Sequence, residues 1–275
     1  MTRLIGKWFL GTDLPDLSVA SIGETDLGAQ YKMSGNPLYG ASGAPSYLDV
    51  NQGYVGDCYF MASLGEVALE DPNRIESMIR DDGNGSYGVR FIVDGHADWV
   101  TVNGELPTMP SGYSFANGSD LEFANGDVAW AELVEKAYAE LNAEPNAPHG
   151  AQLNAASNSY AGISAGSGYA LTEITGQAVN YFGASMLSAD AAEIGAAWSA
   201  KEDLIVGTSN IASGNIVADH MFEVIGFNAA NNTLTLHNPW GSGYSGPLAM
   251  TFTESLTSLA AADCEVFATT GKAIA

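Results

Sequence analysis

Cysteine is scarce in this chain of 275 residues, which contains only Cys58 and Cys264. Two cysteines cannot build the disulfide framework that small secreted domains use in place of a large core, and they could form one bridge at most. We expect both thiols to be reduced, with at least one of them serving as a small apolar side chain of the core.

Basic residues are also scarce, because nine Lys and Arg face 32 Asp and Glu, for a formal net charge of −23. Such a surface repels nucleic acid and anionic membranes, so neither is an expected partner. The charge has two interpretations: solubility in a salty or extracellular setting, or the binding of cations.

Long apolar runs are missing, although hydrophobic residues make up 46% of the chain. No segment is long enough for a membrane span. Residues 1–18 contain two basic residues and a short apolar patch, but not the apolar core of a signal peptide. Localisation is left open: a cytoplasmic protein, a protein exported without a recognisable leader, and a domain of a longer multidomain chain all fit.

Apolar spacing divides the chain into a helical first half and a second half of antiparallel strands. Residues 1–45 are loop-rich, and residues 150–168, rich in Gly, Ser, Ala and Asn, form a junction. Helices are predicted at 58–69, 74–79, 128–141 and 189–201; a β-hairpin at 89–93 and 97–102; and strands at 204–208, 221–227, 233–238, 248–252 and 265–269.

The segment QGYVGDCYF, residues 52–60, places Cys58 behind glycines and at the start of a predicted helix. A helix start and a nearby histidine lower the pKa of a thiol and activate it as a nucleophile. Gly53 and Gly56 permit a sharp turn, and the amides there, with the Gln52 side chain, could stabilise an oxyanion. The alternative is a buried structural cysteine.

Of the four histidines, His96 lies in a predicted turn and His149 in a polar loop, so both are expected at the surface. His220 begins one predicted strand, and His237 ends the next, directly before Asn238. A hairpin would bring His220 beside Asn238, which could hold the imidazole in one tautomer.

Trp240 could shield that hydrogen bond from water. Taken singly, His220 could be a satisfied strand histidine, and Asn238 a turn residue of HNPWG. The order Gln, Cys, His, Asn is nevertheless the order of a cysteine-protease site.

Four segments resemble the calpain-type branch of the papain-like cysteine proteases. QGYVGDCYFMASLGEVA is similar to the family's QGxxGDCWxLAALASL, AWAELVEKAYAELN to FWxALLEKAYAKLN, DHMFEVIGF to GHAYSVTG, and LHNPWG to RNPWG. GYALTEITGQAV also resembles GFEDFTGG. The match runs from about residue 45 to residue 245 and covers only the catalytic core.

The resemblance implies an α+β, papain-like fold of two lobes with the active site in the cleft between them. Residues 1–45 would be an N-terminal extension, 46–166 a helical subdomain carrying the nucleophile, and 167–275 a β-rich subdomain carrying His and Asn.

It also implies roles for individual residues. Cys58 would be the nucleophile, His220 the general base and acid, and Asn238 its orienting partner. Gln52 would donate to the oxyanion together with the Cys58 amide, and Trp240 would cover the Asn238–His220 contact. Gly56 matches the second glycine of the family's QGxxGDC segment, which leads to the nucleophile.

Two positions depart from the family pattern. Tyr59 stands where the family has Trp, which keeps an aromatic side chain beside the nucleophile. Asp219 replaces a Gly before His220, where a carboxylate could raise the histidine pKa or point to solvent.

Calcium aligns the lobes of animal calpains, so the resemblance suggests calcium as an activator, while the chemistry needs no cofactor. Asp49 matches a ligand of the first lobe, and Glu135 is a second candidate. In the second lobe, Tyr244 falls at or near the position of an acidic residue, so that site looks degraded.

The expected activity is that of a cysteine-type endopeptidase, which hydrolyses polypeptide substrates through an acyl-thioester on Cys58. Two alternatives stay open on the same scaffold: a catalytically silent peptide-binding module and a thiol acyl transferase.

Overall fold

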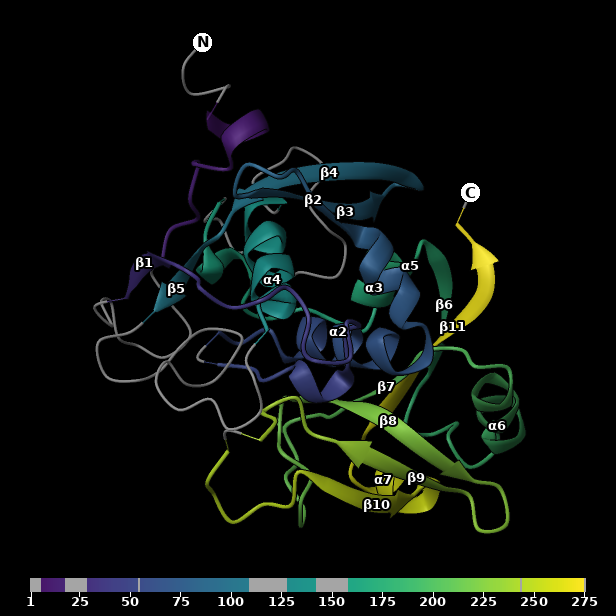
Figure 1. Ribbon diagram of the computed structural model, residues 1–275. Coiled ribbons are helices and arrows are strands. Elements are labelled where there is room, and N and C mark those ends of the chain that lie inside the picture. The colour runs from purple at the N-terminus through teal and green to yellow at the C-terminus, as the bar shows by residue number, and fades with distance from the viewer. Residues whose placement is uncertain are drawn as a thin grey trace.

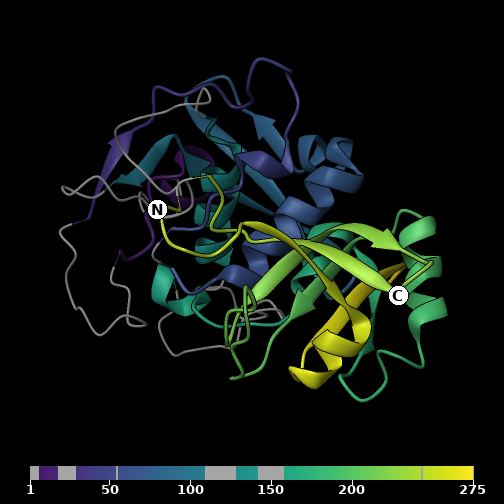
Figure 2. The same ribbon diagram turned by 90° about the horizontal axis from the view of Figure 1, so that it is seen from below.

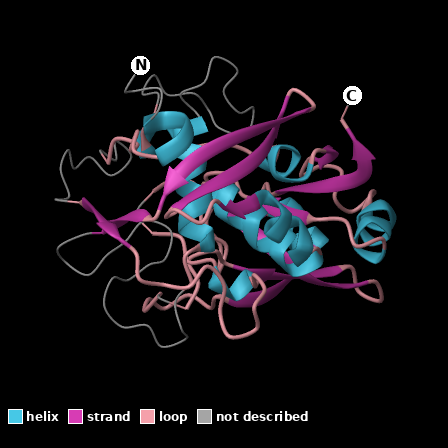
Figure 3. Ribbon diagram, turned by 45° about the horizontal axis from the view of Figure 1, so that its top comes forward, coloured by secondary structure: helices cyan, strands magenta, loops and turns pink. Residues whose placement is uncertain are grey.

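A computed structural model describes residues 6–17, 29–53, 55–108, 128–141, 158–242 and 244–274. The helices gather in the middle of the molecule, with strands on two sides of them (Figure 3). The main helices are α2 (Cys58–Glu70), α3 (Pro72–Met78), α4 (Trp130–Leu141), α5 (Ala170–Thr175), α6 (Ala191–Ser199) and α7 (Leu256–Ala261); the short helical turns are η1 (Gly6–Leu10), η3 (Tyr47–Asp49) and η4 (Tyr160–Ile163).

Helix α2 is the central element, lying between the upper and lower parts of Figure 1. It begins at Cys58 and ends at Glu70, because Pro72 disfavours a helical conformation in the residue before it, Asp71. Pro72 then starts α3, where a missing N–H costs nothing. Almost every side chain of α2 is buried, and the helix forms the first core together with α4 and α5.

A three-stranded sheet in the order β2-β3-β4 covers this first core. Its strands are β2 (Ile79–Asp81), β3 (Ser86–Val93) and β4 (His96–Asn103). Strands β3 and β4 form the predicted hairpin, whose turn residues Asp94 and Gly95 both have positive φ, 49° and 77°, as a tight two-residue turn requires. Strands β1 (Gln30–Met33) and β5 (Glu105–Thr108) form a separate antiparallel pair.

The C-terminal part forms a six-stranded antiparallel sheet in the order β10-β9-β8-β7-β11-β6. The strands are β6 (Gln177–Phe182), β7 (Leu204–Gly207), β8 (Met221–Asn228), β9 (Thr233–His237), β10 (Thr251–Ser255) and β11 (Glu265–Ala273). Figure 2 shows the light-green strands of this sheet with the yellow helix α7 beside them.

Alternation along the strands gives this sheet two buried faces. Met221 of β8 belongs to the first core with α2, whereas Phe222 and Val224 belong to a second core with α7. The sheet is therefore packed directly against the helix that begins at Cys58.

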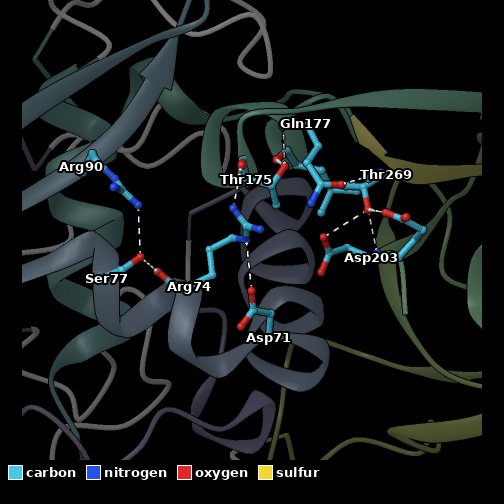
Figure 4. A network of polar contacts seen from close by, with 11 residues as sticks. Asp71, Arg74, Ser77, Arg90, Thr175, Gln177, Asp203 and Thr269 are labelled. Atoms are coloured by element: carbon cyan, nitrogen blue, oxygen red, sulfur yellow. Dashed lines mark hydrogen bonds and ion pairs between the residues drawn. The ribbon is translucent and has the colours of Figure 1, made fainter. Parts of the chain in front are cut away.

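Below the hairpin, polar contacts tie α3 to the chain around β6, β7 and β11 (Figure 4). The Arg74 guanidinium donates to the Thr175 carbonyl at 2.8 Å and lies 3.5 Å from the Asp71 carboxylate. The Asp203 amide donates to the Thr269 hydroxyl at 2.8 Å. The first of these bonds joins α3 to the end of α5, and the last joins the residue before β7 to β11.

The predicted α+β class is confirmed, and the predicted helices are present with ends shifted by a few residues. The first half contains more strand than expected, namely β1, β2 and β5, because these strands are short and lack clear alternation. Helix α5 lies beyond the predicted subdomain boundary but packs in the first core. The division into three segments stays a prediction, and residues 150–157 of the predicted junction lie outside the described residues. None of the helices in the described part of the chain combines the length and apolar character needed to cross a bilayer.

Candidate active site

Cys58 is the first residue of α2 and is half-buried. Its sulfur lies close to the backbone amide of Met221, the residue after His220, and near the amides of Tyr59 and Cys58 itself, all of which favour the thiolate. Burial is the larger influence and, together with the Asp57 carboxylate, raises the pKa of the Cys58 thiol to about 12. In this conformation the thiol keeps its proton.

His220 and Asn238 are brought together as the hairpin argument predicted, with His220 Nε2 at 2.9 Å from Asn238 Oδ1. Asn238 Oδ1 also accepts the Trp240 amide at 3.1 Å, which an amide nitrogen could not do. The oxygen therefore faces the imidazole, so Nε2 carries the hydrogen and Nδ1 is left as the base. Burial lowers the pKa of His220 to about 4, and the Asn238 bond partly opposes this.

The segment before Cys58 and the turn after β9 are bonded to each other, although they are far apart in sequence. The Gln52 amide donates to the Pro239 carbonyl at 2.7 Å, and the Ser242 hydroxyl to Asn51 Oδ1 at 3.3 Å. Gly241 has φ of 63° and packs so tightly on Asn51 that a side chain there would collide with it. These contacts place the HNPWG turn beside the loop that leads to Cys58.

The side chains predicted to support the site occupy distinct positions. The Trp240 ring centroid lies 5.0 Å from that of His220, and the Tyr244 ring centroid 5.0 Å from that of Trp240; the shielding of the His220–Asn238 bond by Trp240 stays a prediction. Tyr59 points into the first core, where its hydroxyl donates to the Ile163 carbonyl at 3.0 Å. The Gly56 carbonyl accepts the Ala165 amide at 2.9 Å and so fixes the loop before Cys58.

The Gln52 side chain is buried, and its Nε2 donates to the Val55 carbonyl at 2.8 Å. An amide nitrogen carries two hydrogens, and the Gln52 side chain also lies near the Asp57 carboxylate. Its role at the oxyanion stays a prediction.

Asp57 is a buried carboxyl group beside the nucleophile that the sequence interpretation missed. It has no solvent exposure, and neither of its carboxylate oxygens accepts a hydrogen bond of good geometry. Burial raises the pKa of Asp57 to about 7. The side chains of Glu135, in α4, and of Gln52 lie close enough to the Asp57 carboxylate to oppose this rise in part. The sequence does contain a signal for this carboxyl group, namely a charged residue placed directly between Gly56 and Cys58.

The other candidates lie elsewhere. His237 faces away from the pair and contacts Glu223, with Nδ1 at 2.9 Å from Oε2. His96 is exposed at the start of β4, as expected of a surface residue, and His149 lies outside the described residues. Asp219 is exposed with φ of 50°, so its carboxylate points to solvent. Cys264 is buried and, like Cys58, forms no disulfide.

The two calcium candidates do not form a shared donor set. Asp49 Oδ2 accepts the Ser46 amide at 2.8 Å and the Trp130 indole at 2.9 Å, which is a capping role at η3. Glu135 is buried in α4 near Asp57. Among the described residues, no three His, Cys, Asp or Glu side chains gather closely enough to hold a metal ion. These residues as placed do not fit a calcium cage, and calcium activation stays a prediction.

A cysteine at a helix start and a His–Asn pair at the ends of neighbouring strands, on an α+β fold, are the features of a cysteine protease site. Residues 31–254 match the family model described as calpain family cysteine protease. This chain therefore belongs to the calpain family, as its motifs predicted.

Individual relatives agree with that assignment. The chain is 25% identical over 227 residues to calpain-1 catalytic subunit from Sus scrofa, covering 75% of this chain and 29% of the relative. It is 26% identical over 228 residues to calpain-9 from Mus musculus, covering 74% and 30%. It is 28% identical over 222 residues to calpain clp-4 from Caenorhabditis elegans, covering 72% and 28%. The chain thus spans less than a third of the length of these curated relatives.

Proposed function

We propose that this chain is the catalytic core of a calpain-type endopeptidase, with a papain-like arrangement of two lobes and the substrate cleft between them. The observation that carries the proposal is the orientation of His220: its Nε2 is held by Asn238, and Nδ1 is left as the base. Cys58 lies against the amide of Met221, the next residue along the chain from His220.

The reaction follows from this arrangement. His220 Nδ1 takes the proton of the Cys58 thiol as the sulfur attacks the substrate carbonyl carbon, forming a C–S bond and an oxyanion. The backbone amide of Cys58 and the side-chain amide of Gln52 donate to that oxyanion. His220 then gives its proton to the leaving amine, the C–N bond breaks, and an acyl-thioester remains.

A water molecule completes the cycle. His220 Nδ1 takes one proton of the water as its oxygen attacks the thioester carbonyl. The C–S bond then breaks, the carboxylic acid leaves, and the proton on His220 returns to the Cys58 sulfur.

The resting state keeps both groups neutral, because burial raises the pKa of Cys58 to about 12 and lowers that of His220 to about 4. Proton transfer is therefore expected during the attack rather than before it. Binding of the substrate, or a shift between the lobes, would supply the environment that stabilises the ion pair.

The substrate class is polypeptide, in line with the family. Calcium as an activator and a place within a longer multidomain chain belong to the same proposal. No contact in the described residues favours the silent module or the acyl transferase.

Labelling of the thiol with a peptide aldehyde or epoxide tests the nucleophile. Wild type and Cys264→Ala should be labelled at one site, and Cys58→Ala should not. Equal labelling of wild type and Cys58→Ala would refute the assignment. Hydrolysis of casein with and without an added amine then separates hydrolysis from acyl transfer, because only a transferase would give amide products.

A further inference from the structure

Glu66 lies on α2, about two turns after Cys58. It is fully buried, and its carboxylate reaches the other part of the molecule: Oε1 accepts the Leu204 amide at 3.0 Å and Oε2 the Val224 amide at 3.1 Å. The paired residues of β7 and β8 end at Ile205 and Glu223, so Glu66 takes the two amides just beyond that ladder. One side chain therefore bonds the helix of the nucleophile to both strands.

A second buried pair lies against the same helix. Glu223 and His237 face each other across β8 and β9, with Oε2 and Nδ1 2.9 Å apart. The Glu223 carboxylate packs on α2 at Gly65, where any side chain would collide with it. The ring of Tyr47, in η3, packs edge-on against the imidazole of His237, with the two ring centroids 5.2 Å apart.

These contacts surround the residues that must be aligned. His220 precedes β8 and lies three residues before Glu223, while Asn238 follows His237 directly. The strand that follows His220 is thus hydrogen-bonded to α2 through Glu66, and the Glu223–His237 pair packs against the same helix, with no exposed side chain among them.

Burying three ionisable groups costs free energy that apolar side chains would not cost. Burial raises the pKa of Glu66 well above its usual range and that of Glu223 to about 7. Two bonds from strand amides favour the carboxylate of Glu66, because a protonated oxygen is a poorer acceptor. Such groups are a weak source of stability, but they specify one alignment of the parts they join.

We propose that Glu66 and the Glu223–His237 pair are positioning residues that set the alignment of Cys58 with His220 and Asn238. The proposal rests on the proposed function, since an alignment matters only if these residues react together. Displacement of a reacting group by about 1 Å can cost about a hundredfold in rate, so even a small slip of the strands along α2 should be measurable.

The test measures labelling of Cys58 by a peptide epoxide as a function of pH, located by mass spectrometry of the Cys58 peptide. The variants are Glu66→Gln and Glu223→Gln, which keep the shape of each side chain. The control is Glu70→Gln, on the same helix, whose carboxylate pairs at 2.9 Å with the ammonium of Lys201, a side chain that is largely exposed. Circular dichroism and thermal melts establish that each variant is folded.

We expect Glu66→Gln to slow labelling by the peptide epoxide at neutral pH about tenfold or more, because His220 then meets the Cys58 thiol less well during the attack. Glu223→Gln should act in the same direction, and Glu70→Gln should match the wild type. In peptide hydrolysis, kcat should fall while KM stays unchanged. If Glu66→Gln does not fold, Glu223→Gln alone decides.

Two results would overturn the reasoning, and they differ. Wild-type Cys58 that the peptide epoxide labels no faster than it labels free cysteine would refute the proposed function and this inference with it. An activated wild type, with folded Glu66→Gln and Glu223→Gln variants reacting as fast, would refute only the positioning role.

Discussion

The sharpest test of the site is Asn238→Ala. Asn238 has no solvent exposure, and its Oδ1 accepts from His220 Nε2 at 2.9 Å and from the Trp240 amide at 3.1 Å. The substitution leaves a buried imidazole N–H without an acceptor and frees the ring to adopt the other tautomer, in which Nδ1 carries the hydrogen and cannot act as a base.

The magnitude follows from the lost bond. A buried donor without a partner costs about 1–3 kcal/mol, and each 1.36 kcal/mol of barrier is about tenfold in rate. We therefore expect kcat to fall by about five- to 150-fold, with KM little changed. The Asn238 bond also raises the pKa of His220, so its loss moves that pKa below about 4 and the acidic limb of the pH–rate profile to lower pH.

The assay is initial-rate hydrolysis of a fluorogenic peptide across pH, with thermal melts to establish folding. Ser242→Ala is the matched control, because it removes a 3.3 Å bond to the same turn without touching His220. Folded Asn238→Ala with wild-type kcat, or Ser242→Ala with an equal loss, would refute the role assigned to Asn238.

Three further outcomes are expected. Asp57→Asn removes a charge that raises the pKa of Cys58, so alkylation of Cys58 at mildly alkaline pH should be faster, and a slower reaction would contradict this. The pKa of Asp57, Asp203 and Glu223 is raised to about 7, so the folded chain binds protons that the unfolded chain releases above about pH 4, and stability should fall as pH rises towards 7. His220, with its pKa lowered to about 4, acts in the opposite direction between about pH 4 and 6.5, but one imidazole is outweighed by three carboxyl groups; a melting temperature that rises from about pH 5 to pH 7 would contradict this balance. Activity measured with calcium and with a chelator should differ if calcium aligns the lobes, and equal rates would show that the chain needs no metal.

Much of the site could be predicted because its chemistry is concentrated in short motifs. The helix start at Cys58 is marked by the preceding glycines and the apolar spacing that follows. The pairing of His220 with Asn238 follows from two strands and a short turn. Burial could not be inferred in this way: neither the neutral state of Cys58 and His220 nor the enclosed carboxyl of Asp57 has a local signature.

By itself the sequence determined the candidate nucleophile, base and orienting residue, the α+β class and the family resemblance, because each depends on residue types at short spacing. Only the tertiary structure decided which ring nitrogen of His220 faces Asn238, because that depends on hydrogen bonds across the fold. It also decided that Glu66 reaches strands more than a hundred residues further along the chain, at Leu204 and Val224. No local pattern marks a carboxylate whose partners are backbone amides of distant strands, since those amides come within its reach only when the two cores pack on opposite faces of one sheet.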